Sequence, residues 1–236
     1  MGTTDSQLAP DAAVTAIPRR EGVVVRVAVG LALLVSVVAT PASAASIRCN
    51  QIVDSHGDAR ASVPPGFTQV GPNEPDADIV SGDIASDASS VTTVVRVARL
   101  GSAVEAAPRR VLYQFFFRYG KYEVATLAAR SVDGETFRVH ADNPETHDAS
   151  DASPYVPARG VFDAARNEVR ITIPLGTATQ HRIAARGATF GGLAIEVSRG
   201  VGLNAAGGAS AGDILDSARS PAPYPLASPT CVHVGR

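Results

Sequence analysis

The stretch that decides the fold is Leu112-Tyr-Gln-Phe-Phe-Phe-Arg-Tyr119, which continues through Gly120-Lys121 into Tyr122-Glu-Val-Ala-Thr-Leu127. Successive side chains of a strand point to opposite faces, so every second residue shares a face. One face of residues 112–119 is aromatic: Tyr113, Phe115, Phe117 and Tyr119. Gly120 suits the first loop position of a type II′ turn because glycine tolerates a positive φ. The stretch therefore predicts an antiparallel hairpin whose aromatic face is buried in a core rather than offered to a sugar ring.

The same period of two recurs on both sides of this hairpin. Residues 91–98 and 168–173 are rich in β-branched side chains, and Pro174 ends the second run because proline has no N–H to donate. Further strands are predicted at residues 79–84, 136–141, 160–162 and 190–197, with an edge strand at 47–53. Short helical segments are predicted only at residues 178–186 and 212–219. This pattern predicts an all-β fold, an antiparallel β-sandwich whose jelly-roll or immunoglobulin-like topology stays open.

The first 44 residues have the features of an export signal. An apolar run of 14 residues at 27–40 follows three arginines and precedes Ala42 and Ala44, which suit cleavage after Ala44. The run is shorter than the roughly 20 residues that a membrane-spanning helix needs. We therefore predict a cleaved signal peptide at residues 1–44, using the general or the twin-arginine route, and a single secreted domain at residues 45–236. The sequence has no second long apolar run, so we predict no transmembrane anchor.

The overall charge argues against nucleic acid as a partner. The chain has 21 basic and 23 acidic residues, a net charge of −2, and arginines that are scattered rather than clustered. Proteins that bind nucleic acid carry a basic patch that draws in the phosphate backbone. Nucleic-acid binding is therefore not expected.

The two cysteines, Cys49 and Cys231, lie near the two ends of the predicted mature domain. An even pair of cysteines in an oxidising compartment is read as a disulfide, which here would join the ends of the domain. The alternative is a pair of free thiols.

Acidic residues near glycine and proline raise the question of a metal. Asp54 and Asp58 flank Gly57, and Asp76 and Asp78 follow Pro75. Calcium prefers six to eight oxygen ligands, which acidic loops at the end of a sandwich supply if they meet. Further candidate ligands are Glu74, Asp213 and Asp216. Because aspartate and glycine are also ordinary turn residues, the preferred interpretation is structural turns, with a calcium site as the second.

Motifs of catalysis are sparse. The sequence has no Ser-x-x-Lys and no His-Glu-x-x-His, and its five histidines are dispersed. Glu123, Glu168 and Glu196 fall on the predicted solvent faces of strands, which disfavours a carboxylate pair for sugar hydrolysis. We therefore predict a secreted, non-catalytic binding or surface-interaction module for carbohydrate or cell-wall material, with Tyr119, Tyr122 and Tyr155 near loops as ligand-binding residues. The alternative is a secreted hydrolase whose active site is assembled from separate loops.

The order of short motifs resembles a family. These motifs are Cys49, Val53-Asp54, Gly57-Asp58-Ala59, Pro75-Asp76-Ala77-Asp78-Ile79, Gly160-Val161-Phe162-Asp163, Ile173-Pro174 and Cys231. They resemble actinobacterial secreted β-sandwich proteins without an established activity, and are loosely similar to family 9 carbohydrate-binding and DOMON-like sandwiches. The second resemblance implies binding of sugar or haem, and sometimes calcium. The chain departs from it by having no tryptophan, and by having Met1, in the predicted leader, as its only methionine.

Overall fold

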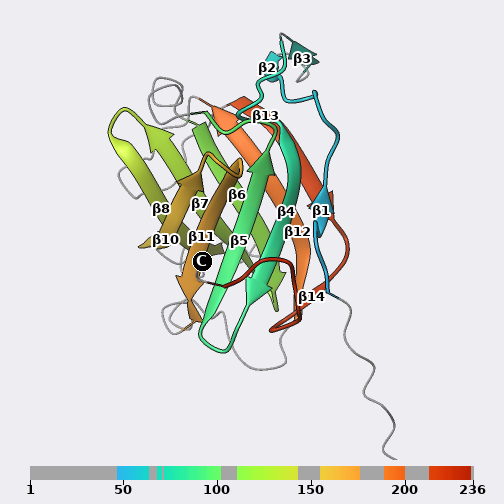
Figure 1. Ribbon diagram of the computed structural model, residues 1–236, viewed down its shortest axis with the longest axis vertical. Coiled ribbons are helices and arrows are strands. Elements are labelled where there is room, and N and C mark those ends of the chain that lie inside the picture. The colour runs from blue at the N-terminus through green and yellow to red at the C-terminus, as the bar shows by residue number, and fades with distance from the viewer. Residues whose placement is uncertain are drawn as a thin grey trace, which may run out of the picture. The chain divides into compact units, whose positions relative to one another are not determined.

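The computed structural model describes residues 47–63, 68–70, 72–101, 111–142, 155–175, 189–199 and 213–234. The predicted signal peptide and the predicted helical segment at 178–186 lie outside these residues. Within them the chain forms two antiparallel sheets, so the predicted all-β class is confirmed (Figure 1). A separate small sheet pairs β2 (Ala61–Val63) with β3 (Thr68–Val70), two strands that the sequence pattern does not predict.

The first main sheet has five strands in the order β1-β4-β5-β11-β10. Their bounds are Ile52–Val53 (β1), Ile79–Ser86 (β4), Ser90–Val97 (β5), Glu168–Pro174 (β11) and Arg159–Asp163 (β10). The edge strand predicted at residues 47–53 is confirmed in part: only Ile52 and Val53 form β1, where they pair with Gly82 and Ser81. Pro174 is the last residue of β11, as expected for a residue without an N–H.

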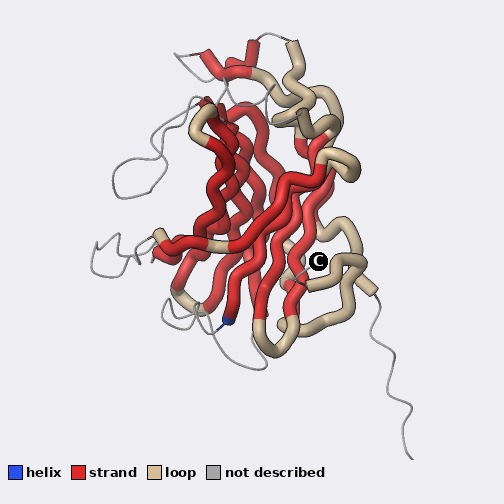
Figure 2. Tube along the Cα trace, turned by 60° about the vertical axis from the view of Figure 1, so that its left-hand side comes forward, coloured by secondary structure: helices blue, strands red, loops and turns tan. Residues whose placement is uncertain are grey.

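The second main sheet has seven strands, six of them in the order β13-β12-β6-β7-β8-β9, while β14 pairs separately with β12. Their bounds are Asp213–Ser220 (β13), Thr189–Arg199 (β12), Val111–Tyr119 (β6), Tyr122–Ser131 (β7), Gly134–Asp142 (β8), Val156–Pro157 (β9) and Tyr224–Pro225 (β14). Figure 2 shows the strands of both sheets in red, with tan loops between them.

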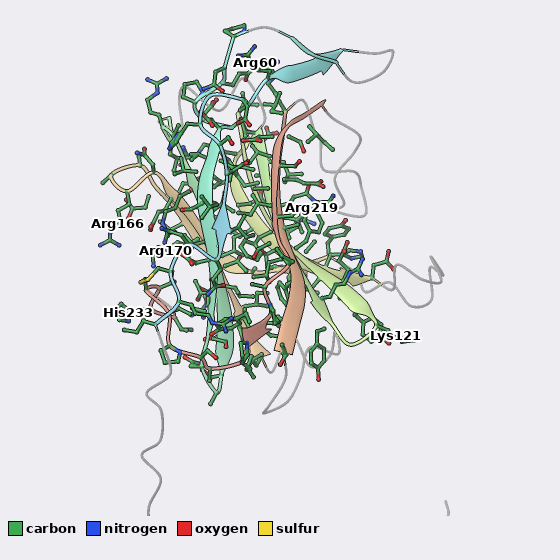
Figure 3. The ribbon with its side chains drawn as sticks, turned by 90° about the vertical axis from the view of Figure 1, so that its right-hand side faces the viewer. Arg60, Lys121, Arg166, Arg170, Arg219 and His233 are labelled. Carbon is green, nitrogen blue, oxygen red and sulfur yellow. A yellow bond between two sulfur atoms is a disulfide. The ribbon has the colours of Figure 1, made fainter. Side chains whose placement is uncertain are left out.

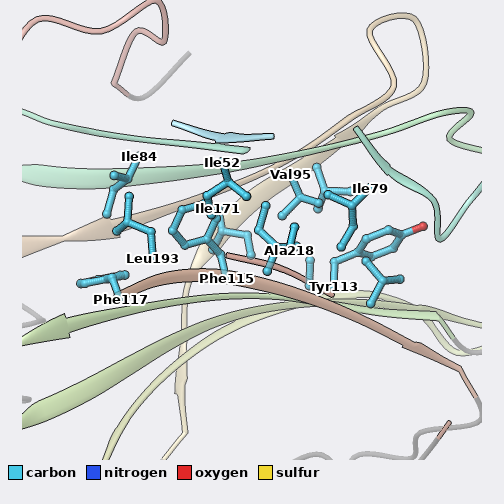
Figure 4. Close-up of a cluster of buried hydrophobic side chains, with 14 of the residues drawn as sticks. Ile52, Ile79, Ile84, Val95, Tyr113, Phe115, Phe117, Ile171, Leu193 and Ala218 are labelled. Carbon is cyan, nitrogen blue, oxygen red and sulfur yellow. The ribbon is translucent and has the colours of Figure 1, made fainter. Parts of the chain in front are cut away.

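The predicted central hairpin is confirmed. Tyr119 pairs with Tyr122, which leaves Gly120 and Lys121 as the two loop residues, and Gly120 has a φ of 57°. The aromatic face is buried as predicted, because Tyr113, Phe115 and Phe117 are all 0% exposed. These rings meet aliphatic side chains of the five-stranded sheet, so the two sheets face each other across one hydrophobic core (Figure 4).

The prediction of a helical segment at residues 212–219 is wrong. Asp213–Ser220 is strand β13, which pairs with β12 along the edge of the seven-stranded sheet. Leu215 and Ala218 belong to the core, whereas Ser217 and Arg219 are exposed. The segment has few β-branched residues, so only its pairing with β12, a tertiary contact, makes it a strand.

Gly160 in β10 shows how closely the two sheets approach. A Cβ atom at this position would lie 2.1 Å from a ring carbon of Phe137 and 2.6 Å from the carbonyl oxygen of Arg170. We expect Gly160→Ala to lower the free energy of unfolding by about 1–3 kcal/mol, the usual cost of overpacking. Gly191→Ala is the matched control, because no atom lies within 4 Å of a Cβ placed there. Urea unfolding of both variants gives the comparison, and equal midpoints would contradict the close packing at Gly160.

Candidate metal centre

Three aspartates meet where an edge strand of one sheet lies near an edge strand of the other. Asp54 directly follows β1, the edge of the five-stranded sheet, and Asp216 lies in β13, the edge of the seven-stranded sheet. The loop at residues 54–60 is bonded to both sheets. The N–H of Asp54 donates to Val80 O of β4 (3.3 Å), and the N–H of Arg60 donates to Leu215 O of β13 (3.0 Å). The loop at 54–60 thus brings Asp58 to the same place.

Strand alternation sets the orientation of Asp216, next to a β-bulge. The register between β12 and β13 shifts between Val197 and Ser198, opposite Asp216 and Ile214. Leu215 is the extra residue, and from Asp216 onward the side chains alternate regularly between buried and exposed. Asp216 is two residues from Ala218, a core residue, and only 5% of Asp216 is exposed. The carboxylate therefore points between the sheets and not into solvent.

The three carboxylates form a compact group. Asp54, Asp58 and Asp216 each offer one oxygen, and these oxygens all lie within 4.8 Å of one another. Backbone N–H groups hold two of the side chains: Ser55 donates to Asp54 Oδ1 (2.9 Å), Ile79 to Asp216 Oδ2 (2.7 Å) and Ser217 to Asp216 Oδ1 (2.8 Å). The folded backbone therefore preorganises the group.

Several oxygens at this end of the sandwich are buried without a hydrogen-bond donor. Among the described side chains, the buried atoms without a partner include Asp54 Oδ2, Asp58 Oδ1 and Asn73 Oδ1. A buried oxygen without a partner costs about 1–3 kcal/mol, and more when it is charged. A cation, or a proton shared between two of the carboxylates, would satisfy such acceptors.

Electrostatics favour the same conclusion. Burial raises the pKa of Asp216 to about 7; hydrogen bonding from the Ile79 N–H opposes this rise, while the charges of Asp54 and Asp58 add to it. Burial also raises the pKa of Asp54; the hydrogen bonds with the Ser55 N–H and with Asp216 oppose this rise, and the charges of Asp58 and Asp78 add to it. The carboxylates repel one another in a partly dry setting, and a bound cation would reverse that repulsion.

Asp76 and Asp78 lie outside this group of three carboxylates, although the sequence predicts them as calcium ligands together with Asp54 and Asp58. Asp78 is 2% exposed and accepts hydrogen bonds from the Gly57 N–H (3.0 Å) and from Asn73 Nδ2 (2.8 Å). It therefore supports the turn at Gly57 that carries Asp58. The carbonyl of Asp76 accepts a hydrogen bond from the Tyr113 hydroxyl (2.8 Å), whose pKa burial raises.

The remaining candidate ligands have other surroundings. Glu74 forms an ion pair with Arg199 of β12. The side chain of Asp213 lies outside the described residues. Among the described side chains, Asp216 is thus the further candidate that the structure brings to Asp54 and Asp58, and it does so through the pairing of β13 with β12.

The predicted disulfide is confirmed. Cys49 and Cys231 are bonded, with their Cα atoms 5.2 Å apart. Two backbone hydrogen bonds flank the bond, from the Arg48 N–H to Pro229 O (3.1 Å) and from the Cys231 N–H to Arg48 O (3.2 Å). Both chain ends of the described domain are therefore fastened at one place, which lies beside His233 in Figure 3.

The three tyrosines predicted to bind ligand do not share one platform. Tyr119 packs edge-on against Phe190, with ring centroids 6.1 Å apart. Tyr122 lies under Lys121 Nζ at 5.2 Å, at the tip of the hairpin. Tyr155 stacks on His140 with centroids 4.3 Å apart. Each ring already has an aromatic or cationic neighbour within the chain, and ligand binding by them stays a prediction.

The sequence reasoning missed a hollow on the outer face of the seven-stranded sheet. Its lining includes Phe116, Arg118, Glu123, Glu196 and Arg219. The signal that could have located it is Gly191-Gly192 inside a strand pattern, because glycine in a strand often marks a bulge.

A sequence motif of hydrolases surrounds Ser210. The spacing Gly-x-Ser-x-Gly occurs at residues 208–212, around Ser210, outside the described residues. In α/β-hydrolases this motif leads from a strand into a helix. Here the residues that follow it form strand β13. The element that follows the motif thus differs from the helix that follows it in α/β-hydrolases.

Among the described residues, no helix combines the length and apolar composition needed to cross a bilayer. Comparison of the chain with protein-family models, with curated proteins and with solved structures finds no match. The function must therefore be inferred from the chain's own residues, and the resemblance to secreted sandwich families stays a prediction.

Proposed function

We propose that the chain is an exported, non-catalytic binding module whose open edge is closed by a calcium ion at Asp54, Asp58 and Asp216. The observation that carries the calcium site is the set of three carboxylates within 4.8 Å of one another, two of which have a buried oxygen without a hydrogen-bond partner. Export is supported by the disulfide, because disulfides persist in oxidising compartments.

The donor set selects the kind of cation. Carboxylate oxygens suit calcium and magnesium, whereas zinc and copper are usually held by histidine or cysteine. Calcium accepts six to eight oxygens in a flexible arrangement, so water can complete a shell that three carboxylates begin. Magnesium requires near-ideal octahedral geometry and loses its water reluctantly, so it should stabilise the protein less.

The place of the site suggests what the cation does. Asp54 and Asp58 belong to the segment after β1, and Asp216 belongs to β13, so one ion would cross-link edge strands of the two sheets. Both strands are terminal in their sheets and gain fewer pairing contacts than central strands. The bound ion would then hold the two sheets together at the edge of the sandwich that carries the 54–60 loop.

Calcium should raise the melting temperature of the mature protein. A ligand at 100 times its dissociation constant stabilises by about 2.7 kcal/mol, and each kcal/mol shifts the melting temperature of a chain of this size by about 2–4 °C. Extracellular calcium modules bind with dissociation constants of about 0.1–1 mM, so about 10 mM calcium approaches this regime at the tighter end. We therefore expect a rise of about 5–10 °C by circular dichroism, compared with the protein in EDTA.

Asp58→Asn and Asp133→Asn make the test specific. Asp58 Oδ1 has no hydrogen-bond partner, so the amide removes charge at the site without breaking a described hydrogen bond there. Asp133 is an exposed aspartate in the turn between β7 and β8. The calcium response should vanish in Asp58→Asn and persist in Asp133→Asn. A wild-type melt that ignores calcium, or equal responses in the two variants, would show that the site is not a calcium site.

Catalysis is tested separately. Glu123 and Glu196 line the same hollow, and burial raises the pKa of Glu196, with Arg219 opposing and Glu123 reinforcing the rise. Unequal carboxylates in one cleft are a feature of glycoside hydrolases. We expect no release of reducing sugar from neutral polysaccharides. Release that disappears in Glu196→Gln would establish the hydrolase alternative.

A further inference from the structure

We propose that the hollow on the outer face of the seven-stranded sheet binds a neutral carbohydrate. The hollow has a volume of about 380 Å³ and lies over β6, β7, β12 and β13. This inference rests on the proposed role as a binding module but not on the calcium site, because different residues carry it. Its volume is near the lower end of ligand pockets, which suits a short stretch of a glycan.

Strand register creates the hollow. Arg219 pairs with Ala194, Ala194 pairs with Phe116, and Phe116 pairs with Ala125, so these residues form one row across β13, β12, β6 and β7. Side chains of paired residues lie on the same face of a sheet. The small Ala194 thus lies between two long side chains, Arg219 and Phe116, and the surface of the sheet is depressed at Ala194.

A bulge in β12 deepens the low point. The pairing of β12 with β6 shifts between Gly191 and Ala194, and Gly192 has a φ of 57°. Glycine adopts such a φ without strain and adds no side chain to the floor. Phe116 is half-buried beside this floor and presents an aromatic surface to it.

Charged groups of both signs surround the floor. Arg118 Nε lies 3.7 Å from Glu123 Oε2, and Arg219 Nη2 lies 4.0 Å from Glu196 Oε1. Both separations exceed an ordinary charge-assisted hydrogen bond of about 2.7–2.9 Å. The side chains are 61% exposed for Arg118 and 77% for Arg219, so their guanidinium groups can turn toward a ligand.

This chemistry matches a neutral sugar better than other ligands. Two guanidinium groups and two carboxylates balance, so neither an anion nor a cation is favoured by net charge. Vicinal hydroxyl groups donate to carboxylates and accept from guanidinium groups, while the C–H face of a sugar ring packs on an aromatic ring such as Phe116. Three of the four strands beneath the hollow are paired on both sides, so a peptide could add a strand only along β13, the edge of the sheet, and not within the hollow.

The binding test uses an array of immobilised glycans. It contains neutral oligomers of glucose, xylose, mannose, galactose and N-acetylglucosamine, together with uronate and sulfated glycans. The mature protein should bind at least one neutral oligomer. Binding to anionic glycans alone, or to no glycan on the array, would overturn the proposal.

Matched substitutions assign the binding to the hollow. Arg219→Gln and Glu196→Gln should each weaken binding of the selected neutral oligomer by about tenfold or more, because each removes a hydrogen bond to a charged group. Ala194→Leu should abolish binding by filling the floor. Arg166→Gln is the control: Arg166 is 64% exposed, is 3.8 Å from Asp163, and lies on the opposite side of the molecule from Arg219 (Figure 3). Equal affinities for all four variants would contradict the assignment.

Two further measurements separate this proposal from the calcium site. Each variant is melted with calcium and with EDTA, which also shows that it is folded. The hollow variants should keep the full calcium response, because Asp216 points between the sheets while Arg219 points outward. Glycan binding without any calcium response would refute only the calcium site. A calcium response without binding to neutral glycans would refute only the sugar site.

Discussion

Replacing Cys49 and Cys231 together by serine should lower the free energy of unfolding by up to about 5 kcal/mol, the largest effect expected in this protein. The bond joins residues 182 positions apart, so it removes much of the conformational freedom of the unfolded chain. A change of this size corresponds to a fall in melting temperature of about 10–20 °C for a chain of this length. Thermal melts of the oxidised wild type and the double variant measure it.

Reduction of the wild type provides the control. Both cysteines are exposed, so a soluble thiol reductant should reach the bond without prior unfolding. The reduced wild type and the double serine variant should then melt at the same temperature, because both lack the bond and keep the hydrogen bonds between Arg48 and its neighbours in the C-terminal segment. A double variant that melts within 2 °C or so of the oxidised wild type would contradict the constraint that we assign to the bond.

Arg96→Met should have the second largest effect, a loss of about 3–5 kcal/mol. Arg96 Nη1 donates to Asp83 Oδ2 (2.6 Å) and Arg96 Nε donates to Glu168 Oε1 (2.8 Å). The side chain of Asp83 is 0% exposed and that of Glu168 is 8% exposed. Removing the guanidinium leaves the buried Asp83 without this ion-pair partner and leaves Glu168 with Arg170 alone, which costs far more than losing an exposed pair.

Arg166→Met is the matched control for Arg96→Met. It breaks an arginine–carboxylate pair of 3.8 Å whose arginine is 64% exposed, and exposed pairs contribute about 0–1 kcal/mol. Urea unfolding should therefore separate the two variants by at least about 2 kcal/mol. A further variant, Arg96→Met with Asp83→Asn, should recover part of the loss, since it removes the unpaired charge of Asp83. Equal midpoints for the two single variants would show that the network is not buried in solution.

The same network makes stability depend on acid. Burial alone would raise the pKa of Glu168, but hydrogen bonds and charges from Arg170 and Arg96 outweigh burial and hold the pKa below its usual value of 4.5. A group with a lowered pKa in the folded state stabilises the protein above its unfolded pKa, and that contribution is lost as the pH falls further. The stabilising contribution of Glu168 should thus be complete near neutral pH and decline below about pH 4.5.

The network also corrects one reading of the sequence. Glu168 was predicted to be solvated because it alternates with buried residues in its strand. It does lie on the outer face of β11, but only 6% of it is exposed, since Arg96 and Arg170 cover it. Periodicity predicts the face of a sheet on which a side chain lies, and it carries no information about the neighbours that cover that face.

The disulfide and the proposed calcium ion thus cross-link different parts of the sandwich. The disulfide ties residue 49 to residue 231, and the proposed calcium ion ties the 54–58 turn to β13. Both involve the short N-terminal part of the described domain, where β1 contributes only two residues to its sheet. A strand that short adds little pairing energy, so additional links are expected to hold it in place.

Local sequence determined the elements whose signals are local. Alternating aromatic residues and a glycine at a turn position specify the 112–127 hairpin, because strand geometry repeats every two residues and only glycine readily takes a positive φ there. The pairing of Cys49 with Cys231 followed from there being two cysteines, and the end of β11 followed from Pro174.

Only the tertiary structure decided β13, the carboxylate group and the outer hollow. β13 became a strand by pairing with β12, and that pairing places Asp216 beside Asp54 and Asp58, more than 150 residues earlier in the chain. The hollow likewise depends on which residues of four strands stand in register. Strand partners, register and bulges arise from contacts between distant segments, so the chemistry that they assemble has no local signature in the sequence.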